Sequence, residues 1–253
     1  MVLFRPWDTE FFGVRIGEAR LASVTRESLR NIAEAARGKK IRCLYLFCDC
    51  SDRASAGVLR EAGFDLVEIR QIYEHALVGS PAEPREPKRS QANAKKSPAL
   101  RPVREEDLPE LRRISRDFVP ASRFHRDGHF PPDLCGKYYE LFVDKEFREQ
   151  PRNFWVVSSE AKTVGFVTTQ KETVPEQSSC MPRGRIVLIA VDASMRGQGL
   201  GMSLVQKALE WAGQEGLSSI GVRTQKENTA SCALYGKAGF RLLRQQWIYH
   251  AWL

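Results

Sequence analysis

The 253-residue sequence has no long hydrophobic run. No stretch approaches the roughly 18–20 consecutive apolar residues that a helix needs to cross a bilayer, so we expect no membrane insertion. The opening residues, Met1 to Asp8, have neither the basic start nor the apolar core of a secretion signal. These absences predict a cytoplasmic protein. The length leaves room for a substantial core and for a second, smaller unit.

Cysteine and histidine are scarce, with six and four residues respectively. Six cysteines in a chain of this length do not make a disulfide framework, so we expect free thiols and a reducing compartment. Three of them alternate along a strand-like run over residues 41–50, which favours structural roles. His125 and His129 lie one helical turn apart with Asp127 between them, but no third spaced ligand follows. We therefore expect no metal, with a site at this pair as the alternative.

The net charge is +8, and part of it lies in the segment 79–98. This segment is rich in Pro, Ser, Lys and Arg, has five basic against two acidic residues, and shows no periodicity. It is predicted to be a flexible linker between a unit over residues 1–78 and a unit over residues 99–253. No nucleic-acid-binding module is recognisable, so we expect no nucleic-acid partner. The remaining positive charge favours a polyanionic small molecule.

A glycine-rich loop follows a strongly apolar run. The run from Ile186 to Val191 is predicted to be a buried strand, and Leu200 to Ala212 has apolar residues at helical spacing. Between them, Arg196 to Gly201 alternates glycine with other residues. A strand, a glycine loop and a helix aim free backbone N–H groups and the positive end of a helix dipole at an anion, usually a phosphate. Arg196 adds a planar cation suited to phosphate oxygens.

The spacing of the glycines excludes two common phosphate sites. A dinucleotide-binding fingerprint needs two residues between its second and third glycines, but only Leu200 separates Gly199 from Gly201. A P-loop would end in Gly-Lys-Ser/Thr, whereas Gly201 is followed by Met202. The alternative is a glycine-rich turn that binds no ligand.

A second strand and helix follow the glycine loop. Ser218 to Thr224 is predicted to be a strand, and the segment from Asn228 to Gly239 a short helix. Asn228 is a good N-cap, and Gly239 stands where a C-terminal stop belongs. Tyr235 follows Asn228 by seven residues, close to two helical turns, so both fall on one helical face. An N-cap asparagine and a core tyrosine are the alternative roles.

The two motifs together resemble those of the GNAT N-acetyltransferase superfamily. Its members carry an arginine-glycine-x-glycine-x-glycine loop after a strand, then an asparagine, a tyrosine and a glycine-phenylalanine pair. The resemblance implies an α/β fold with a mixed, splayed sheet flanked by helices, and acetyl-CoA as cosubstrate. It implies coenzyme contacts along one strand end, the glycine loop and the asparagine: Leu188, Ile189, Ala190, Val191, Arg196, Gly197, Gln198, Gly199, Leu200, Gly201 and Asn228.

Acetyl transfer from a thioester to an amine needs oxyanion stabilisation, a proton for the leaving thiolate and a neutral amine. A strand interrupted beside the glycine loop, expected at Leu188 to Val191, can offer a backbone N–H to the thioester carbonyl. The resemblance places Tyr235 near the thioester sulfur, where a phenol with an ordinary pKa of about 10 is a suitable acid. Many members carry a carboxylate base on the strand before the loop, but Ile186 to Val191 has none. The base is then a water chain or a residue from elsewhere.

The N-terminal unit repeats part of the C-terminal one. With an offset of 176, residues 41–77 align without a gap on residues 217–253, and nine of the 37 positions are identical. Random pairing would give about two identities. Under this offset Leu59 stands opposite Tyr235, and no similar glycine loop precedes residue 98. We expect a degenerate half-GNAT domain that shapes the substrate cleft. A chance similarity between two α/β halves is the alternative.

Further motifs are similar to one group within the superfamily. Pro6 to Gly13, Arg20 with Leu21, Ser122 to Phe124 and the ending Tyr249 to Leu253 resemble the bacterial dTDP-fucosamine acetyltransferases. This resemblance implies an acetyltransferase that acts on the amine of a nucleotide-linked (dTDP) amino sugar. The alternatives are another amine, such as an aminoglycoside, a polyamine or a protein N-terminus, and a catalytically silent acyl-CoA-binding module.

The segment from Asp117 to Asp144 is dense in arginine, histidine, aspartate and aromatic residues. It falls where the superfamily has its variable acceptor-binding helices. We expect Arg123 and Arg126 to bind a diphosphate of the acceptor, and Phe124 to stack on its base or sugar. A solvated loop with ordinary charges is the alternative. The sequence leaves open the identity of the acceptor amine and association into a homodimer.

Overall fold

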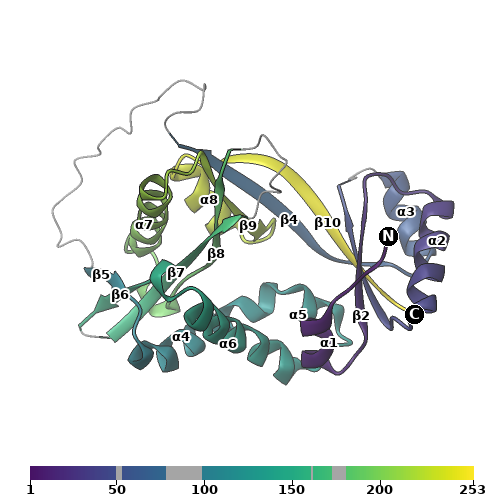
Figure 1. Cartoon of the computed structure of the whole chain (residues 1–253), viewed down its shortest axis with the longest axis horizontal. Coiled ribbons are helices and arrows are strands. Elements are labelled where there is room, and N and C mark those ends of the chain that lie inside the picture. The colour runs from purple at the N-terminus through teal and green to yellow at the C-terminus, as the bar shows by residue number, and fades with distance from the viewer. Residues whose placement is uncertain (50–52, 78–98, 161, 173–180) are drawn as a thin grey trace.

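The structure is a computed structural model that describes residues 1–49, 53–77, 99–160, 162–172 and 181–253. Within these residues one ten-stranded sheet runs in the order β1-β2-β3-β10-β4-β9-β8-β7-β6-β5 (Figure 1). Its strands are β1 (Leu3–Phe4), β2 (Ile16–Leu21), β3 (Cys43–Cys48), β4 (Asp65–Ala76), β5 (Ala99–Pro102), β6 (Phe154–Ser159), β7 (Lys162–Glu172), β8 (Arg183–Val191), β9 (Ser219–Gln225) and β10 (Arg241–Trp252). The pairs β2·β3 and β8·β9 are parallel and the other neighbours are antiparallel. The predicted α/β fold with a mixed sheet is confirmed.

Helices cover both faces of this sheet. They are α1 (Pro6–Phe12), α2 (Arg26–Gly38), α3 (Arg53–Glu61), α4 (Leu108–Ser115), α5 (Arg123–Asp127), α6 (Pro132–Glu149), α7 (Leu200–Gln214) and α8 (Thr229–Lys237). Val167 packs in the cluster under α7, whereas its neighbour Phe166 packs in the cluster under α4 and α6. Because successive strand residues point to opposite faces, these helices lie on opposite sides of the C-terminal strands. Figure 1 shows the same arrangement.

The two segments that align in the sequence have the same succession of elements. β3, α3 and β4 correspond to β9, α8 and β10, and the bounds of α3 and β4 recur 176 residues later. The final strands lie side by side: β4 is inserted between β10 and β9, and β10 between β3 and β4. Each half therefore completes the sheet of the other. The division into units 1–78 and 99–253 stays a prediction, and the linker over 79–98 lies outside the described residues.

The parallel pair β8·β9 holds together only at its start. The registered pairs run from Arg183 with Ser219 to Ile186 with Val222, while β8 continues to Val191. Beyond these pairs the strands are no longer bonded to each other, and that edge of β8 is left open. The sheet is splayed at this point, next to the loop that leads into α7.

None of the helices among the described residues combines the length and the low polarity required of a membrane span. Cys43, Cys135 and Cys232 are free thiols, but Cys48 is disulfide-bonded. The expectation of free thiols was therefore wrong for Cys48.

Asp107 fixes the edge strand β5 to the rest of the domain. Its carboxylate accepts two hydrogen bonds from Arg101 of β5 (2.7 Å each) and one from Thr163 of β7 (2.5 Å), and Arg104 N–H donates a fourth (2.8 Å). Desolvation raises the pKa of Asp107, but the hydrogen bonds from Arg101, Thr163 and Arg104 outweigh it and lower that pKa below its ordinary value.

We expect Asp107→Ala to lower the free energy of unfolding by about 2–3 kcal/mol at pH 7, because the buried Thr163 hydroxyl and the partly buried donors of Arg101 and Arg104 lose a charged acceptor. A carboxyl with a lowered folded pKa stabilises the protein above its ordinary pKa of about 3.9, and this contribution is lost as pH falls through the folded value. Urea unfolding should therefore show a smaller loss of stability below pH 4 in the variant than in the parent. Glu105→Ala, in the same turn and exposed, is the control, and equal stabilities of the two variants would contradict the assignment.

Candidate active site

The loop between β8 and α7 is built to receive an anion. Gly197 and Gly199 have positive φ values of 78° and 84°, and nothing lies within 4 Å of where a Cβ would stand on either. Asp192 fixes the start of the loop by accepting hydrogen bonds from Ser194 and Arg113, which hold its pKa well below the usual range. The first bond inside α7 is donated by Ser203 to the Gly199 carbonyl (3.2 Å), so the N–H groups of the first turn have no acceptor within the helix.

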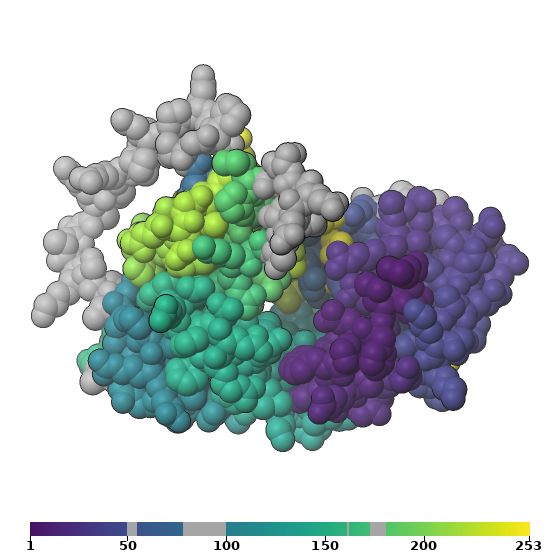
Figure 2. Space-filling view, viewed as in Figure 1, coloured from purple at the N-terminus to yellow at the C-terminus, as the bar shows by residue number. Residues whose placement is uncertain are grey.

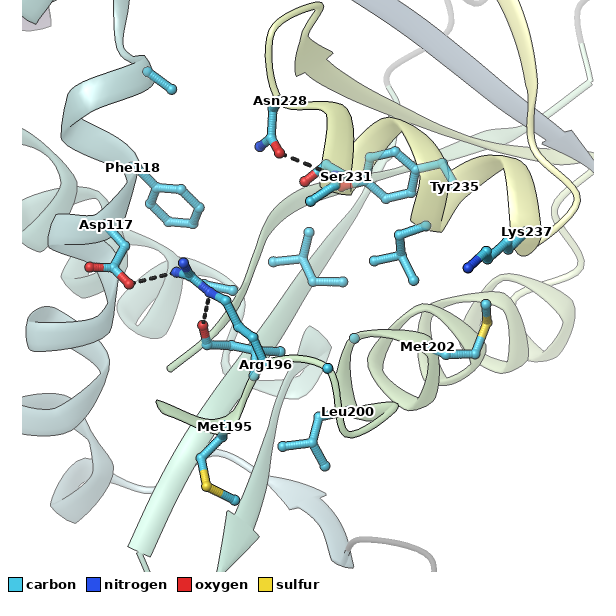
Figure 3. Close-up of a pocket in the computed structure, with 18 of the residues that line it drawn as sticks. Asp117, Phe118, Met195, Arg196, Leu200, Met202, Asn228, Ser231, Tyr235 and Lys237 are labelled. Atoms are coloured by element: carbon cyan, nitrogen blue, oxygen red, sulfur yellow. Dashed lines mark hydrogen bonds and ion pairs between the residues drawn. The ribbon is translucent and has the colours of Figure 1, made fainter. Parts of the chain in front are cut away.

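A cavity of about 790 Å³ opens over this loop (Figure 3). It lies between the loop, the first turn of α7, α8 and the turn before α5. Its lining combines ten residues of the β8 end and the glycine loop with residues from the other two elements: Ile189, Ala190, Val191, Met195, Arg196, Gly197, Gly199, Leu200, Gly201, Met202, Asp117, Phe118, Pro120, Ala121, Arg126, Glu227, Asn228, Ala230, Ser231, Leu234, Tyr235 and Lys237. Of the predicted coenzyme contacts, Leu188 and Gln198 are not brought to the cavity.

The open edge of β8 presents backbone donors to this cavity. Leu188 N–H is directed to Thr168 Oγ1 of β7 (3.1 Å), and Asp192 N–H to the Val164 carbonyl (2.8 Å). Because successive N–H groups of a strand point to opposite sides, those of Ile189 and Val191 point away from β7. They face the gap that the splay leaves beside β9. An N–H fixed in this way is a suitable donor to a carbonyl oxygen that gains negative charge.

Arg196 reaches across the cavity mouth. Its Nη2 lies 2.6 Å from Asp117 Oδ2, and its Nε donates to the Val191 carbonyl (3.1 Å), as the dashed lines in Figure 3 show. Both side chains of the ion pair are about half exposed, so the pair stabilises the fold by at most about 1 kcal/mol. The guanidinium is therefore available to a competing phosphate at small cost.

Asn228 combines a structural role with a free amide. Its Oδ1 caps α8 by accepting a hydrogen bond from Ser231 N–H (3.1 Å), as the N-cap pattern predicts. The oxygen is used by the helix, while the amide nitrogen points away from α8 into the cavity (Figure 3). A side chain held in this way presents two donors to a ligand.

Tyr235 lies on the inner face of α8 and lines the same cavity. Its ring is 2% exposed and packs 5.9 Å from the Tyr73 ring and 5.8 Å from the Phe240 ring, measured between centroids. Burial raises the pKa of the phenol above its ordinary value, so the hydroxyl keeps its proton at neutral pH. A protonated phenol beside a ligand cavity can donate a proton to a basic leaving group.

A strand that ends in a glycine loop, a helix N-terminus and a buried tyrosine thus converge on one cavity. A family model described as "Acetyltransferase (GNAT) family" matches residues 111–240, which contain all of these elements. The chain belongs to the GNAT family of acetyltransferases. The protein is therefore an acetyltransferase, as the resemblance of its motifs implied.

Relatives of this acetyltransferase cover different shares of it. The dTDP-fucosamine acetyltransferase of Escherichia coli O6:H1 is 25% identical over 246 residues, 96% of this chain and 95% of that protein. The mycothiol acetyltransferase of Saccharomonospora viridis is 29% identical over 108 residues, 39% of this chain and 35% of that protein. A solved GCN5-related N-acetyltransferase from Sphaerobacter thermophilus, 14% identical, has the same fold with a TM-score of 0.63 and covers 99% of this chain and 75% of that one.

Several residues that line the cavity of this GNAT enzyme were not predicted from its sequence. Asp117 and Phe118 come from the turn before α5, and Lys237 closes α8 on the side of Met202 (Figure 3). Lys237 follows Tyr235 by two residues in the last turn of α8, where a basic side chain is common because it complements the helix dipole, so nothing in the sequence set it apart. Nothing in the local sequence indicated that Asp117 would meet Arg196, 79 positions away.

The predicted acceptor residues are not brought together. Arg126 lines the cavity and lies 3.5 Å from Glu227. The Arg123 guanidinium instead lies over the Tyr45 ring, 4.3 Å from its centroid, and its Nη1 is buried without a hydrogen-bond partner among the described residues. Phe124 is 3% exposed and packs in the aromatic core of the N-terminal half. Their role in binding the acceptor stays a prediction.

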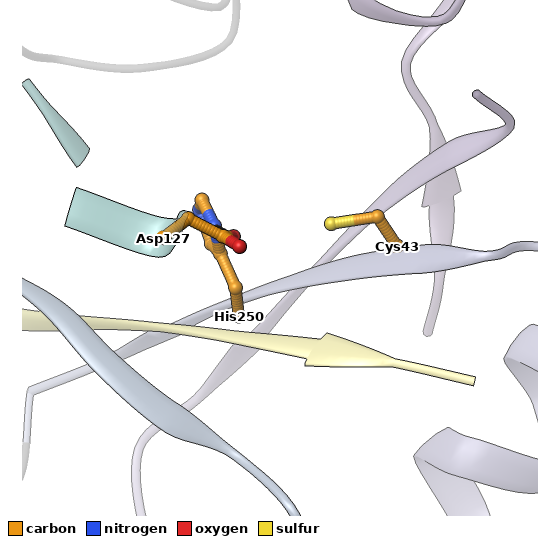
Figure 4. Close-up of side chains that lie close together, drawn as sticks. All are labelled: Cys43, Asp127 and His250. Atoms are coloured by element: carbon orange, nitrogen blue, oxygen red, sulfur yellow. Dashed lines mark hydrogen bonds and ion pairs between the residues drawn. The ribbon is translucent and has the colours of Figure 1, made fainter. Parts of the chain in front are cut away.

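The histidine pair does not form the cluster that its spacing suggested. His129 Nδ1 contacts Asp127 Oδ1 (2.8 Å), but His125 is exposed and takes no part. Asp127 instead accepts hydrogen bonds from His250 and from Trp252 Nε1 (3.0 Å), and Cys43 lies beside them (Figure 4). Burial lowers the pKa of His250 to about 4, so the imidazole is neutral at neutral pH. The cluster fastens the end of α5 to β10.

Proposed function

We propose that this enzyme transfers the acetyl group of acetyl-CoA to a primary amine of a nucleotide-linked amino sugar. The observation that carries the donor half is the cavity itself, which gathers the glycine loop, the open edge of β8 and Tyr235. Its volume of about 790 Å³ is in the range of roughly 300–1,000 Å³ typical of cofactor sites. The first-turn N–H groups of α7, with Arg196 and Lys237, suit the diphosphate of the coenzyme.

Different groups of the chain would serve the separate steps of the reaction. The N–H groups of Ile189 and Val191 would donate to the thioester oxygen as it becomes negative when the amine attacks. Tyr235 would give its proton to the departing thiolate, and the raised pKa keeps that proton in place until then. The described part of β8 has no carboxylate to accept the amine proton, so a water chain or a group of another element would take it.

The proposed acceptor is supported by the share of the chain that one relative matches. The mycothiol acetyltransferase relative matches 39% of the chain, whereas the relative named dTDP-fucosamine acetyltransferase matches 96% of it. A similarity that includes β1 to β4 is expected if the N-terminal half serves a similar acceptor. The exchange of β4 and β10 makes that half part of the same sheet as the catalytic motifs.

Thiol release from acetyl-CoA, followed with a chromogenic disulfide, tests the proposal. We expect the highest kcat/KM with a dTDP-linked 4-amino-4,6-dideoxysugar among a panel that includes an aminoglycoside, a polyamine and a peptide N-terminus. If a simple amine gives a higher kcat/KM than every nucleotide sugar, the proposed class of acceptor is wrong. If the protein binds acetyl-CoA but releases no thiol with any amine, it is a catalytically silent acyl-CoA-binding module.

A further inference from the structure

A second cavity, of about 400 Å³, lies on the other side of the splayed strands. Its floor is formed by β4, β8 and β9, and Phe142 of α6 and the bulged part of β10 border it. In Figure 2 the molecule is hollowed between the purple N-terminal part and the teal part that contains α6, and β4 and β10 are seen at the bottom of this hollow. The cavity thus lies where the two halves of the chain meet.

Arginine dominates the lining of this cavity. Five arginines and three glutamates line it, and they come from β4, β7, β8, β9 and β10: Arg70, Arg183, Arg185, Arg223, Arg244, Glu68, Glu74 and Glu172. The lining therefore carries more positive than negative charge. Arg20 of β2 adds to the positive field from the N-terminal half, since it is one of the charges that act on Arg223.

Three of these arginines are already engaged by carboxylates. Arg70 makes two hydrogen bonds to Glu68 (2.7 and 3.1 Å), Arg244 one to Asp49 (2.7 Å), and Arg183 lies 3.6 Å from Glu74. These pairs neutralise the edges of the cavity. Together with the pair of Arg223 and Glu172, they leave one of the five positive charges unbalanced among the described residues, that of Arg185 on the floor of the cavity.

Arg185 and Arg223 occupy the centre of that floor. Among the described residues no carboxylate lies within ion-pair distance of Arg185, whose Nη2 donates to the neutral Gln170 Oε1 (2.9 Å). Arg223 pairs with one carboxylate, Glu172, at 3.5 Å, about as far as Arg183 lies from Glu74. Burial and repulsion by Arg185 lower the pKa of Arg223 even though Glu172 opposes this. Arg185 is partly buried and the Arg223 side chain is about half exposed, and two cations that repel each other at the floor of a cavity favour an anion between them.

Gly221 keeps the floor open between these arginines. It stands opposite Arg185 in the register of β8 and β9 and two residues before Arg223, so all three lie on one face of the sheet. A Cβ on Gly221 would meet only ordinary contacts, with the Tyr73 carbonyl at 3.5 Å and the Gly184 carbonyl at 3.9 Å. Packing alone would accept a side chain here. The glycine instead leaves space above the strand.

We infer that Arg185 and Arg223 bind a phosphate group of the acceptor, a nucleoside-diphosphate sugar, on the floor of this second cavity. The inference rests on the proposed function for the identity of the acceptor. Both guanidiniums present forked donors that match phosphate oxygens.

The two cavities border successive parts of the same elements. Arg185 to Val187 of β8 line the second cavity, and Ile189 to Val191 line the coenzyme cavity. On the neighbouring strand, Gly221 to Gln225 line the second cavity, and Asn228 follows in the first. An acceptor anchored at Arg185 and Arg223 would thus extend its amine along the gap between β8 and β9 toward the N–H groups of Ile189 and Val191.

Binding of dTDP by calorimetry, with the enzyme saturated in coenzyme A, tests this site. Coenzyme A occupies the anion site at α7. Any binding of the titrated dTDP must therefore take place at another site. We expect the double variant Arg185→Ala/Arg223→Ala to lose dTDP affinity by about 100-fold or more, since two charge-assisted contacts are lost. Inorganic pyrophosphate should lose affinity in the same variant, and coenzyme A should not. Arg26→Ala/Arg30→Ala on α2, with the same loss of charge, should behave like the parent.

A second variant separates loss of the site from loss of the fold. Gly221→Val fills the floor without removing a charge, and it should weaken dTDP binding while the unfolding midpoint stays close to that of the parent. Unchanged dTDP affinity in the arginine double variant, or no dTDP binding by the parent at millimolar concentration, would overturn the inference. A third outcome separates the two proposals. If dTDP binding depends on the two arginines but no nucleotide sugar is acetylated, the anion site is supported and only the proposed acceptor is wrong.

Discussion

Replacement of Tyr235 by phenylalanine is expected to lower kcat by about 10²–10⁴-fold, the usual contribution of a positioned general acid. The change removes one oxygen and leaves the ring that packs against Tyr73 and Phe240. We therefore expect the fold and the affinity for acetyl-CoA to be retained. Single-turnover thiol release together with calorimetric acetyl-CoA binding measures both quantities.

The pH dependence gives this prediction a second readout. Burial raises the pKa of the Tyr235 phenol above the ordinary value of about 10, so the acid is protonated throughout the range in which the enzyme is assayed. The ratio of parent to variant kcat should then be constant between about pH 6 and 9. A ratio that collapses toward one at alkaline pH within this range would indicate a phenol that has lost its proton, contrary to the assignment.

The matched control is another buried tyrosine. Tyr249 of β10 is 3% exposed and belongs to the core between the N-terminal strands and α2, away from the cavity. Tyr249→Phe should turn over like the parent. If Tyr235→Phe also turns over at the parent rate, Tyr235 is a packing residue and the proton for the thiolate comes from another source.

Much of the candidate coenzyme site was predictable because it is built from local patterns. The strand before the loop, the glycines with positive φ and the N-cap Asn228 each depend on a few neighbouring residues, and the seven-residue interval to Tyr235 fixed the common helical face. The strand and helix bounds of the repeat likewise followed from a constant offset. These elements needed no knowledge of distant partners.

The arrangement of the two halves was not predictable in the same way. A hydrophobic pattern identifies β4 and β10 as strands, but it does not say that each pairs with strands of the other half. Asp127 and His250 are 123 positions apart, and only the exchange of strands brings them into contact. The two arginines of the inferred acceptor site were missed for the same reason. Arg223 is the single charge of β9, and Arg185 stands with Arg183 at the start of the otherwise apolar β8, which was a usable signal for a polar face beside the splay.

The largest effect on ligand binding is expected from Gly197→Asp. The loop leaves space at this Cβ position, and the new carboxylate would stand in it, beside the first-turn N–H groups of α7. A carboxylate near a helix N-terminus is itself stabilised there, so it would occupy the donors intended for the diphosphate and repel that diphosphate. We expect acetyl-CoA affinity to fall by about 1,000-fold or more, since several charge-assisted contacts are lost together.

Gly63→Asp provides a control with the same backbone strain. Gly63 also has a φ of 78° and open space at its Cβ position, but it lies between α3 and β4, far from the coenzyme loop in the sequence. Both substitutions place a side chain in the left-handed region and should lower the unfolding midpoint by similar, small amounts. Calorimetry should then find acetyl-CoA binding lost in Gly197→Asp and retained in Gly63→Asp. Equal affinities in the two variants would remove the glycine loop from the coenzyme site, because the strain is matched and only the position of the carboxylate differs.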